Sequence, residues 1–479
     1  MIRKPIVGRQ SAIATLEEAY ASETPTLVSI VGRRRIGKTF LVRQVYRDRI
    51  SFAVTGILNA PLREQLGNFR LALLRYFGDE AVAKSPTTWL DAFALLGKLL
   101  ERHLKQDGAK RVVFLDEVPW LASHRSGFLR AFGWFWNSWA VEHRVVVVIC
   151  GSAASWMVRK VIRDRGGLHN RITHRIRLDP FTLAETSAFM DARQLVGETY
   201  QRVQLYMALG GVPFYLEQLR SGETAIQAVQ RLFFDKAAPL AGEFEILFRS
   251  LFAESEYHTA IVRALADKQV GYTREDLRKA ARINSSGTLT RVLEELQLSG
   301  FILRSQPFGK TRKDALYRLM DEYSRFYLKF VEGAPTNGAQ FTDIARTPSF
   351  RTWSGLAFEN LAIRHARQLT HALNLDNVAV VASTFIARGT EDAAGVQVDL
   401  LFDRSDRAIT LVEVKFSDAP FTFTQAHANE LRSKRARFVA HTGTRKAVFI
   451  ALLTTFGVES ERYSLGVVDQ VVEVEELMQ

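Results

Sequence analysis

The feature that most constrains this chain is the octapeptide at residues 32–39, because it fits the phosphate-loop pattern G-x-x-x-x-G-K-[ST]. An apolar run at residues 26–31 precedes it and predicts a strand, and a helical pattern follows it. In such a loop the glycines let backbone N–H groups surround phosphate oxygens, while the lysine contacts the β and γ phosphates and the hydroxyl binds Mg²⁺. The sequence therefore predicts a nucleotide site that includes Gly32, Arg33, Arg34, Arg35, Ile36, Gly37, Lys38, Thr39 and Phe40.

A second apolar run, residues 112–115, ends in Asp116 and Glu117. We predict that this strand neighbours the strand before the phosphate loop, so that Asp116 holds Mg²⁺ through water. Glu117 is then placed to orient and deprotonate the attacking water, the role that separates a hydrolase from a nucleotide binder. The next buried strand is predicted to end at Ser152, which we expect to contact the γ phosphate or that water.

Composition limits the class of protein. A chain of 479 residues predicts about three domains, and 47% hydrophobic against 24% charged residues is typical of globular proteins. The longest apolar runs are far shorter than the roughly 20 residues of a membrane helix, and the first residues resemble no secretory signal. With Cys150 as the single cysteine, these features predict a soluble, cytoplasmic protein without disulfides. The net charge of +13 is compatible with a polyanion partner or with solvated surface charge.

The texture of the chain changes along its length and predicts four domains. Residues 1–180 alternate apolar strands with helical stretches, which indicates an α/β fold, and residues 181–250 are mostly helical. Residues 251–333 show three helical patterns followed by two strands, the layout of a winged helix. A linker signal at residues 335–338 separates them from a last domain at 340–479. The winged helix either contacts DNA or packs as a spacer between domains, and its candidate phosphate contacts are Arg291, Arg304, Lys310, Arg312 and Lys313.

The first half of the chain resembles the archaeal-type ATPases of the AAA+/STAND group. The resemblance rests on the phosphate loop, on Asp116 and Glu117, and on residues 6–9, 151–157, 170–171, 178–181 and 210–213. It implies that Gly8 and Arg9 lie near the adenine and that Pro213 belongs to a helical lid. It also implies that Arg171 senses or stabilises the γ phosphate, either within the chain or from a neighbouring subunit of a homo-oligomer. The choice of Arg171 stays open, and a basic loop or nucleic-acid contact is the alternative, because other arginines lie nearby: Arg163, Arg165, Arg175 and Arg177.

The last domain carries a second set of acidic residues. Glu359 lies on a helical pattern, and Asp399 and Glu413 lie on two successive strands of a predicted hairpin, which can bring them to one cation. Lys415 shares a strand face with Glu413. Oxygen ligands suit Mg²⁺ or Mn²⁺, which activates water while the lysine supports the nucleophile. The order resembles the PD-(D/E)xK nuclease superfamily, although Val398 stands in place of the usual proline.

The fusion of such a domain behind an archaeal-type ATPase is itself a known layout, and a nuclease-like fold that no longer cuts is the alternative. Beyond Lys415, the basic run 432–437 suits either a nucleic-acid backbone or an ordinary exposed helix. In the first domain, Phe132, Trp134, Phe135 and Trp136 are predicted to form core or interface.

The expected fold class is α/β: a P-loop NTPase parallel sheet with a helical lid, a winged helix and a C-terminal α/β restriction-endonuclease-like domain. We expect an ATP-hydrolysing, DNA-directed protein that uses ATP and Mg²⁺, with Mn²⁺ as an alternative at the second site, and whose nucleotide state controls nucleic-acid processing. The alternative is a STAND-type switch, in which ATP gates protein partners or DNA and the last domain binds without cutting. A metabolic P-loop kinase is disfavoured because Glu117 suits water activation.

Overall fold

The computed structural model describes residues 5–78, 85–152, 154–162, 168, 170–195, 197–252, 254–268, 270–334, 340–387, 389, 395–459 and 465–478. These residues form two units that divide between Pro180 and Phe181. The predicted linker at 335–338, Arg163 and Arg165 lie outside the described ranges. No helix within those ranges is long and apolar enough to cross a membrane.

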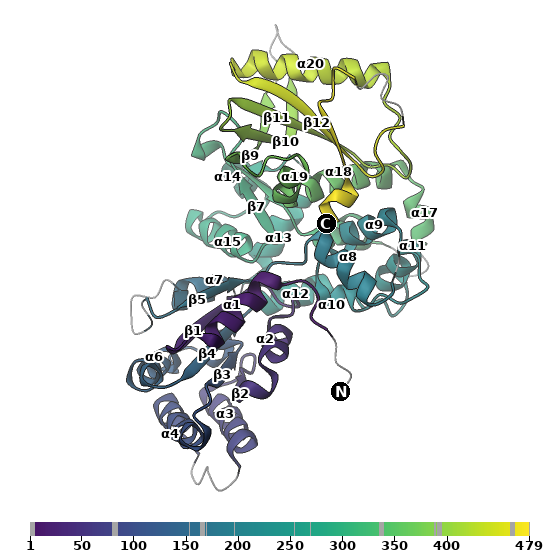
Figure 1. Cartoon of the computed structure of the whole chain (residues 1–479). Helices are drawn as coiled ribbons and strands as arrows, with labels where there is room; N and C mark the ends of the chain where they lie inside the picture. Colours follow the sequence, from purple (N-terminus) through teal and green to yellow (C-terminus); the bar gives the residue numbers. More distant parts are fainter. Residues whose placement is uncertain are drawn as a thin grey trace. The chain divides into compact units, whose positions relative to one another are not determined.

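The first unit is built on a parallel sheet whose five described strands have the order β2-β3-β4-β1-β5 (Figure 1). The strands are β1 (Thr26–Val31), β2 (Ile50–Thr55), β3 (Arg111–Asp116), β4 (Val145–Gly151) and β5 (His174–Arg177). The predicted α/β parallel sheet is confirmed, and β2 is a strand that the sequence reading did not include. Because β4 lies between β1 and β3, the expectation that the Asp116 strand directly neighbours the phosphate-loop strand is wrong.

Helices on the first sheet supply two buried clusters. They are α1 (Gln10–Ala21), α2 (Lys38–Tyr46), α3 (Leu62–Phe77), α4 (Trp89–Asp107), α5 (Val118–Leu121), α6 (Phe128–Ser138) and α7 (Ala154–Met157). Helices α1 and α2 share one apolar core with β1, β3, β4 and β5. An aromatic cluster, in which Phe69 contacts Phe52 and Phe93, joins β2, α3 and α4. Phe132, Phe135 and Trp136 are buried as expected, but Trp134 is 41% exposed, since it lies on the outer face of α6.

The second unit starts with helices, as the sequence predicts for residues 181–250. They are α8 (Leu183–Ala192), α9 (Thr199–Leu209), α10 (Pro213–Leu216), α11 (Ala225–Val229) and α12 (Glu243–Leu251). The turn between α9 and α10 requires glycine, because a Cβ on Gly211 would lie 1.9 Å from the carbonyl oxygen of Phe181. Pro213 follows in the first turn of α10, where its missing N–H costs no hydrogen bond.

Residues 255–319 combine helices with a small antiparallel sheet. The helices are α13 (Ser255–Asp267), α14 (Arg274–Ala280) and α15 (Ser286–Leu298), and the strands are β6 (Tyr272–Thr273), β7 (Ile302–Ser305) and β8 (Leu316–Leu319). The described strands have the order β6-β8-β7. Thr273 and Ser285 cap α14 and α15 by accepting backbone N–H groups, which fixes where the two helices begin.

The rest of the second unit is an α/β layer. Its helices are α16 (Glu322–Phe326), α17 (Phe341–Ala345), α18 (Pro348–Arg364), α19 (Ala366–Ala372) and α20 (Gln425–Thr442). Its described strands have the order β13-β12-β11-β10-β9 (Figure 1), and they are β9 (Val380–Ala387), β10 (Val396–Arg404), β11 (Ala408–Lys415), β12 (Ala447–Thr454) and β13 (Gln470–Glu473). Strand β11 is antiparallel to β10 and parallel to β12. The hairpin predicted to carry Asp399 and Glu413 is therefore β10–β11.

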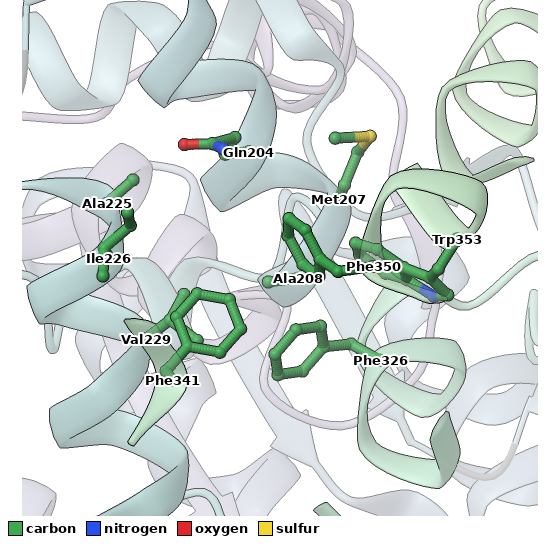
Figure 2. Close-up of a pocket in the computed structure, with 10 residues that line it drawn as sticks. All are labelled: Gln204, Met207, Ala208, Ala225, Ile226, Val229, Phe326, Phe341, Phe350 and Trp353. Carbon is green, nitrogen blue, oxygen red and sulfur yellow. The ribbon is translucent and has the colours of Figure 1, made fainter. Parts of the chain in front are cut away.

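An apolar cluster packs the helices of the second unit together (Figure 2). Phe326 of α16 contacts Phe341 of α17 and Trp353 of α18, and Met207 and Val229 of α9 and α11 line the same small cavity. Its volume is about 10 Å³, at most the space of one water molecule. The three regions that the sequence divides at 181–250, 251–333 and 340–479 thus share a core, and their independence as domains stays a prediction.

Candidate functional site

The phosphate loop follows β1 and contains backbone conformations that glycine adopts easily and that strain other residues. Gly37 caps α2 with φ 87° and Arg35 has φ 72°, both in the left-handed region that favours glycine. Gly32 is required for a different reason, since a Cβ there would lie 2.3 Å from the carbonyl oxygen of Leu178. The loop therefore turns sharply and presents the N-terminus of α2, an arrangement suited to anions.

Lys38 is buried inside this loop. Its Nζ donates to the carbonyl oxygens of Gly32 and Arg33 at 2.9 and 3.0 Å and to Ser152 Oγ at 3.2 Å. Burial lowers the pKa of Lys38, while the carboxylate of Glu117 opposes the shift. An ammonium group held by neutral acceptors can exchange them for phosphate oxygens, which would restore the charge balance.

Thr39 at the start of α2 and Asp116 at the end of β3 meet although β1, which leads into α2, is not adjacent to β3. Thr39 Oγ1 donates to Asp116 Oδ2 at 2.8 Å, and Thr55 Oγ1 at the end of β2 lies 3.4 Å from the same oxygen. Burial raises the pKa of Asp116, and the Thr39 hydrogen bond opposes that rise. A hydroxyl and a buried carboxylate side by side are ligands that suit Mg²⁺. The predicted pair therefore fits the ion, and Thr55 is a neighbour that the sequence reading missed with β2.

Glu117 and Ser152 form a second pair at this edge of the sheet. The N–H of Ser152 donates to Glu117 Oε2 at 2.9 Å, and the Ser152 hydroxyl donates to Glu117 Oε1. Glu117 itself has φ 49°, a strained backbone that is often retained where it positions a functional group. Ser152 thus connects the predicted base to Lys38, and both lie beside the Thr39–Asp116 pair.

Other predicted nucleotide contacts are placed less directly. Gly8 and Arg9 precede α1, and Arg9 Nη2 donates to the Ile36 carbonyl at 3.3 Å, which ties this segment to the phosphate loop. Phe40 is 39% exposed on α2. Pro213 belongs to the second unit, so its contact with nucleotide stays a prediction.

Arg171 lies exposed in the turn before β5. Since Val31 is level with Arg177 in the parallel sheet, the phosphate loop lies at the carboxyl edge, whereas the residues before β5 lie at the amino edge. This placement argues against a contact of Arg171 with the nucleotide of its own chain, so that a contact with a neighbouring subunit's nucleotide and a basic loop or nucleic-acid contact both stay predictions.

The second acidic site gathers the residues that the sequence singled out in the last domain. Burial, and then the charges of Asp399 and Glu413, raise the pKa of Glu359 above its usual range. Glu413 Oε1 pairs with Lys415 at 2.9 Å and Glu413 Oε2 with Lys434 of α20 at 2.6 Å. Burial works against ionisation of Glu413, yet the two lysines lower its pKa. Lys434, from the predicted basic run, is thus a member of this site.

Asp399 has a partner that the sequence reading missed. Arg318 of β8 lies with Nη2 3.6 Å from Asp399 Oδ1, and its side chain is 4% exposed. Within the described ranges there is no group of three or more acidic, histidine or cysteine side chains that could hold a metal ion. Carboxylate oxygens are the kind of ligand that Mg²⁺ or Mn²⁺ binds, whereas Asp399 and Glu413 are paired here with basic side chains.

The predicted basic contacts of residues 251–333 separate into two groups. Arg291 pairs with Glu254 and lies 3.9 Å from Glu295, so its charge is locally compensated. Arg304 and Lys313, together with Arg274, line a cavity of about 320 Å³. Lys310 is exposed, and Arg312 begins a short helix that also contains Lys313. The cavity, rather than α15, is where positive side chains gather.

The sequence of the chain is similar to that of a known protein family. Residues 6–219 match the family described as an ATPase domain predominantly from Archaea. This part of the chain is similar to archaeal-type ATPase domains. The predicted resemblance is confirmed there, while the winged helix and the nuclease-like domain lie beyond the match and stay predictions. An uncharacterized protein of Methanocaldococcus jannaschii is 23% identical in an alignment 429 residues long that covers 86% of this chain and 88% of that protein.

Solved structures share the fold at low identity. A Walker-type ATPase of Pyrococcus abyssi is 19% identical with a TM-score of 0.50, over 69% of this chain and 99% of that one. The ORC2 protein of Aeropyrum pernix, in complexes with ADPNP and ADP, is 14% identical with a TM-score of 0.42, over 76% of this chain and 97% of that one. The first likeness supports a P-loop ATPase fold.

Proposed function

We propose that the chain binds and hydrolyses ATP at the phosphate loop. The observation that carries this is the connected set at the carboxyl edge of the first sheet, in which Ser152 joins Lys38 to Glu117 and Thr39 contacts Asp116. A protein that binds nucleotide without hydrolysing it needs only the lysine and the hydroxyl, and it does not need Glu117. The strained carboxylate beside them is explained by hydrolysis.

In this mechanism the loop amides and Lys38 hold the β and γ phosphates, and Lys38 releases the carbonyls of Gly32 and Arg33 to do so. Thr39 and, through water, Asp116 would hold Mg²⁺, which neutralises charge on the phosphates. Glu117 accepts the proton of the attacking water at a carboxylate oxygen. Ser152 keeps that carboxylate oriented by donating to both of its oxygens.

The test is ATP binding and phosphate release by the full chain and by Lys38→Ala. Binding and turnover should both fall steeply in Lys38→Ala. Lys105→Ala is the matched control, because Lys105 is 75% exposed and pairs with Glu101 away from the loop. Equal ATP binding by Lys38→Ala and wild type would contradict the proposal.

We also propose that residues 255–319 are a winged helix that contacts DNA phosphates through the cavity lined by Arg274, Arg304 and Lys313. Each lost phosphate contact should reduce the salt dependence of DNA binding by about one unit of log–log slope. Arg274→Ala with Lys313→Ala should therefore flatten the slope, whereas Arg291→Ala should not, because Arg291 is paired with Glu254. If Arg291→Ala alone changed the slope, α15 would be the contacting element.

A second function follows from the acidic site. We propose that Glu359, Asp399, Glu413 and Lys415 form a metal-dependent nuclease site, supported by the electrostatic interaction of Glu359 with the other three. Nicking of plasmid DNA with Mn²⁺ should be lost in Asp399→Ala. Absence of nicking by wild type, with intact ATP turnover, would favour the STAND-type switch and a last domain that only binds.

A further inference from the structure

A buried arginine from the small antiparallel sheet reaches the acidic site. Arg318 of β8 lies 3.6 Å from Asp399 Oδ1, and its charge also interacts with Glu359. Its Nε donates to the carbonyl of Val270 at 3.0 Å, which anchors the guanidinium at the level of β6. A positive group from outside the α/β layer thus lies beside one of the carboxylates that the proposed nuclease site needs and interacts electrostatically with a second.

The guanidinium is poorly matched to this position. Nη2 has no hydrogen-bond partner among the described residues, and the 3.6 Å separation from Asp399 exceeds that of a charge-assisted hydrogen bond. Buried charges are normally paired and hydrogen-bonded with good geometry. Arg318 therefore compensates the charge of the carboxylates without the short contacts of a finished structural ion pair.

Space for an alternative arrangement exists beside the pair. A cavity of about 540 Å³ is lined by Arg318 and Asp399 and by residues of β7, β9 and the loop after β7, among them Ser305 and Ser383. The loop is held to β9 by the N–H of Phe308, which donates to the carbonyl of Thr384 at 2.7 Å. The cavity therefore offers the space beside Arg318 and Asp399 that a displaced guanidinium or a hydrated cation would need.

We propose, resting on the nuclease function proposed above, that Arg318 occupies the cation position beside Asp399 and Glu359 and that a divalent cation binds there only when Arg318 is withdrawn. A guanidinium and a divalent cation need the same carboxylate oxygens and repel each other, so the two are mutually exclusive. Because Arg318 lies on β8, a movement of the proposed winged helix on DNA would open the site. The arrangement prevents cutting before DNA is bound.

The test is to measure how tightly the full chain binds Mn²⁺ in the absence of nucleotide. Electron paramagnetic resonance reports the Mn²⁺ that remains free. All proteins carry Asp116→Asn, so that the phosphate-loop carboxylate does not contribute. Arg318→Met should bind Mn²⁺ at least about ten-fold more tightly than the Arg318 protein, a normal size for such a coupling. Arg318→Gln, which can still donate to Val270 and Asp399, should show a gain in the same direction and serves if Arg318→Met folds poorly.

Two further variants make the result specific. Arg404→Met removes another partly buried arginine paired with an aspartate of the same hairpin, Asp406, and should leave Mn²⁺ binding unchanged. Arg318→Met combined with Asp399→Asn should lose the gain. Equal Mn²⁺ affinity with and without Arg318, or a gain that survives Asp399→Asn, would overturn the proposal.

The same series separates this inference from the nuclease function. Tighter Mn²⁺ binding by Arg318→Met without DNA cleavage would support the exclusion of the cation by Arg318 and contradict the proposed cutting. DNA cleavage by the Asp116→Asn protein that retains Arg318, at a Mn²⁺ affinity equal to that of the protein with Arg318→Met, would support cutting and overturn the role of Arg318.

Discussion

Replacement of Glu117 by glutamine isolates the proposed general base from nucleotide binding. Glutamine has the same shape, so its Oε1 can accept from the Ser152 N–H as the carboxylate does. Its Nε2 can donate to the Ser152 hydroxyl, which keeps the two groups together with the direction of that hydrogen bond reversed. It cannot accept a proton from water. The substitution therefore removes the chemistry and leaves the geometry.

The magnitude follows from what a positioned base contributes. General-base catalysis is worth about 10²–10⁴-fold in rate, which corresponds to about 2.7–5.4 kcal/mol of transition-state stabilisation. The kcat of Glu117→Gln should fall by this factor. Its Kd for ATP should change far less than its kcat, because glutamine keeps the shape of glutamate and its position beside Ser152.

The assay is phosphate release at saturating ATP and Mg²⁺, paired with ATP binding by calorimetry. Glu142→Gln is the matched control, since Glu142 is exposed in the short helix before β4, and it should retain wild-type turnover. A Glu117→Gln protein with kcat within about tenfold of wild type would refute the base assignment. Loss of ATP binding in that variant would show instead that Glu117 is needed for the structure of the loop.

Three further outcomes test the packing that supports the sites. Gly32→Ala places a Cβ 2.3 Å from the Leu178 carbonyl oxygen and should lower the free energy of unfolding by about 1–3 kcal/mol. Gly67→Ala is the control, because a Cβ there has nothing within 4 Å, and it should leave the stability unchanged or raise it. Equal effects of the two substitutions would contradict the argument. Trp353→Ala empties part of the aromatic cluster and should cost about 3–5 kcal/mol of unfolding free energy with unchanged ATP affinity; a loss under about 1 kcal/mol would show that the cluster is not a core. Burial lowers the pKa of His365 to about 4, and its Nε2 accepts from the Leu183 N–H. The contribution of neutral His365 to the free energy of unfolding should therefore be fully present above about pH 6.5 and should fall by up to about 3 kcal/mol as the pH falls towards 4. His365→Gln should flatten this pH dependence in unfolding curves recorded from pH 7 to pH 4.5.

The sequence was most informative where chemistry requires fixed spacing. The phosphate loop needs glycine at positions that are strained or crowded, and Gly32 and Gly37 meet those conditions in the structure. Asp116 and Glu117 could be placed because parallel strands end at one edge of a sheet. Strand order could not be predicted, because it depends on packing between distant segments, so the position of β4 between β1 and β3 was missed.

The C-terminal site shows the opposite limit. Glu359, Asp399, Glu413 and Lys415 could be grouped from their order, since helix and hairpin periodicity brings such residues to one region. Their partners Arg318 and Lys434 come from β8 and α20. Nothing local in the sequence marks Arg318, and the basic run 432–437 marks Lys434 only as part of a nucleic-acid contact or an ordinary exposed helix. Arg291 shows the same limit, because its pairing with Glu254 is a contact between residues distant in sequence.

The two proposed sites combine in one further proposal, made from the order of the domains, that nucleotide at the phosphate loop controls nucleic-acid processing at the acidic site. The measurement that tests it most directly is cleavage of labelled single- and double-stranded DNA by wild type, Lys38→Ala and Glu413→Ala, with and without ATP and Mn²⁺. The account predicts that cleavage is lost in Glu413→Ala and persists in Lys38→Ala without its dependence on ATP. Cleavage that responds to ATP equally in Lys38→Ala and wild type, or that survives in Glu413→Ala, would contradict it.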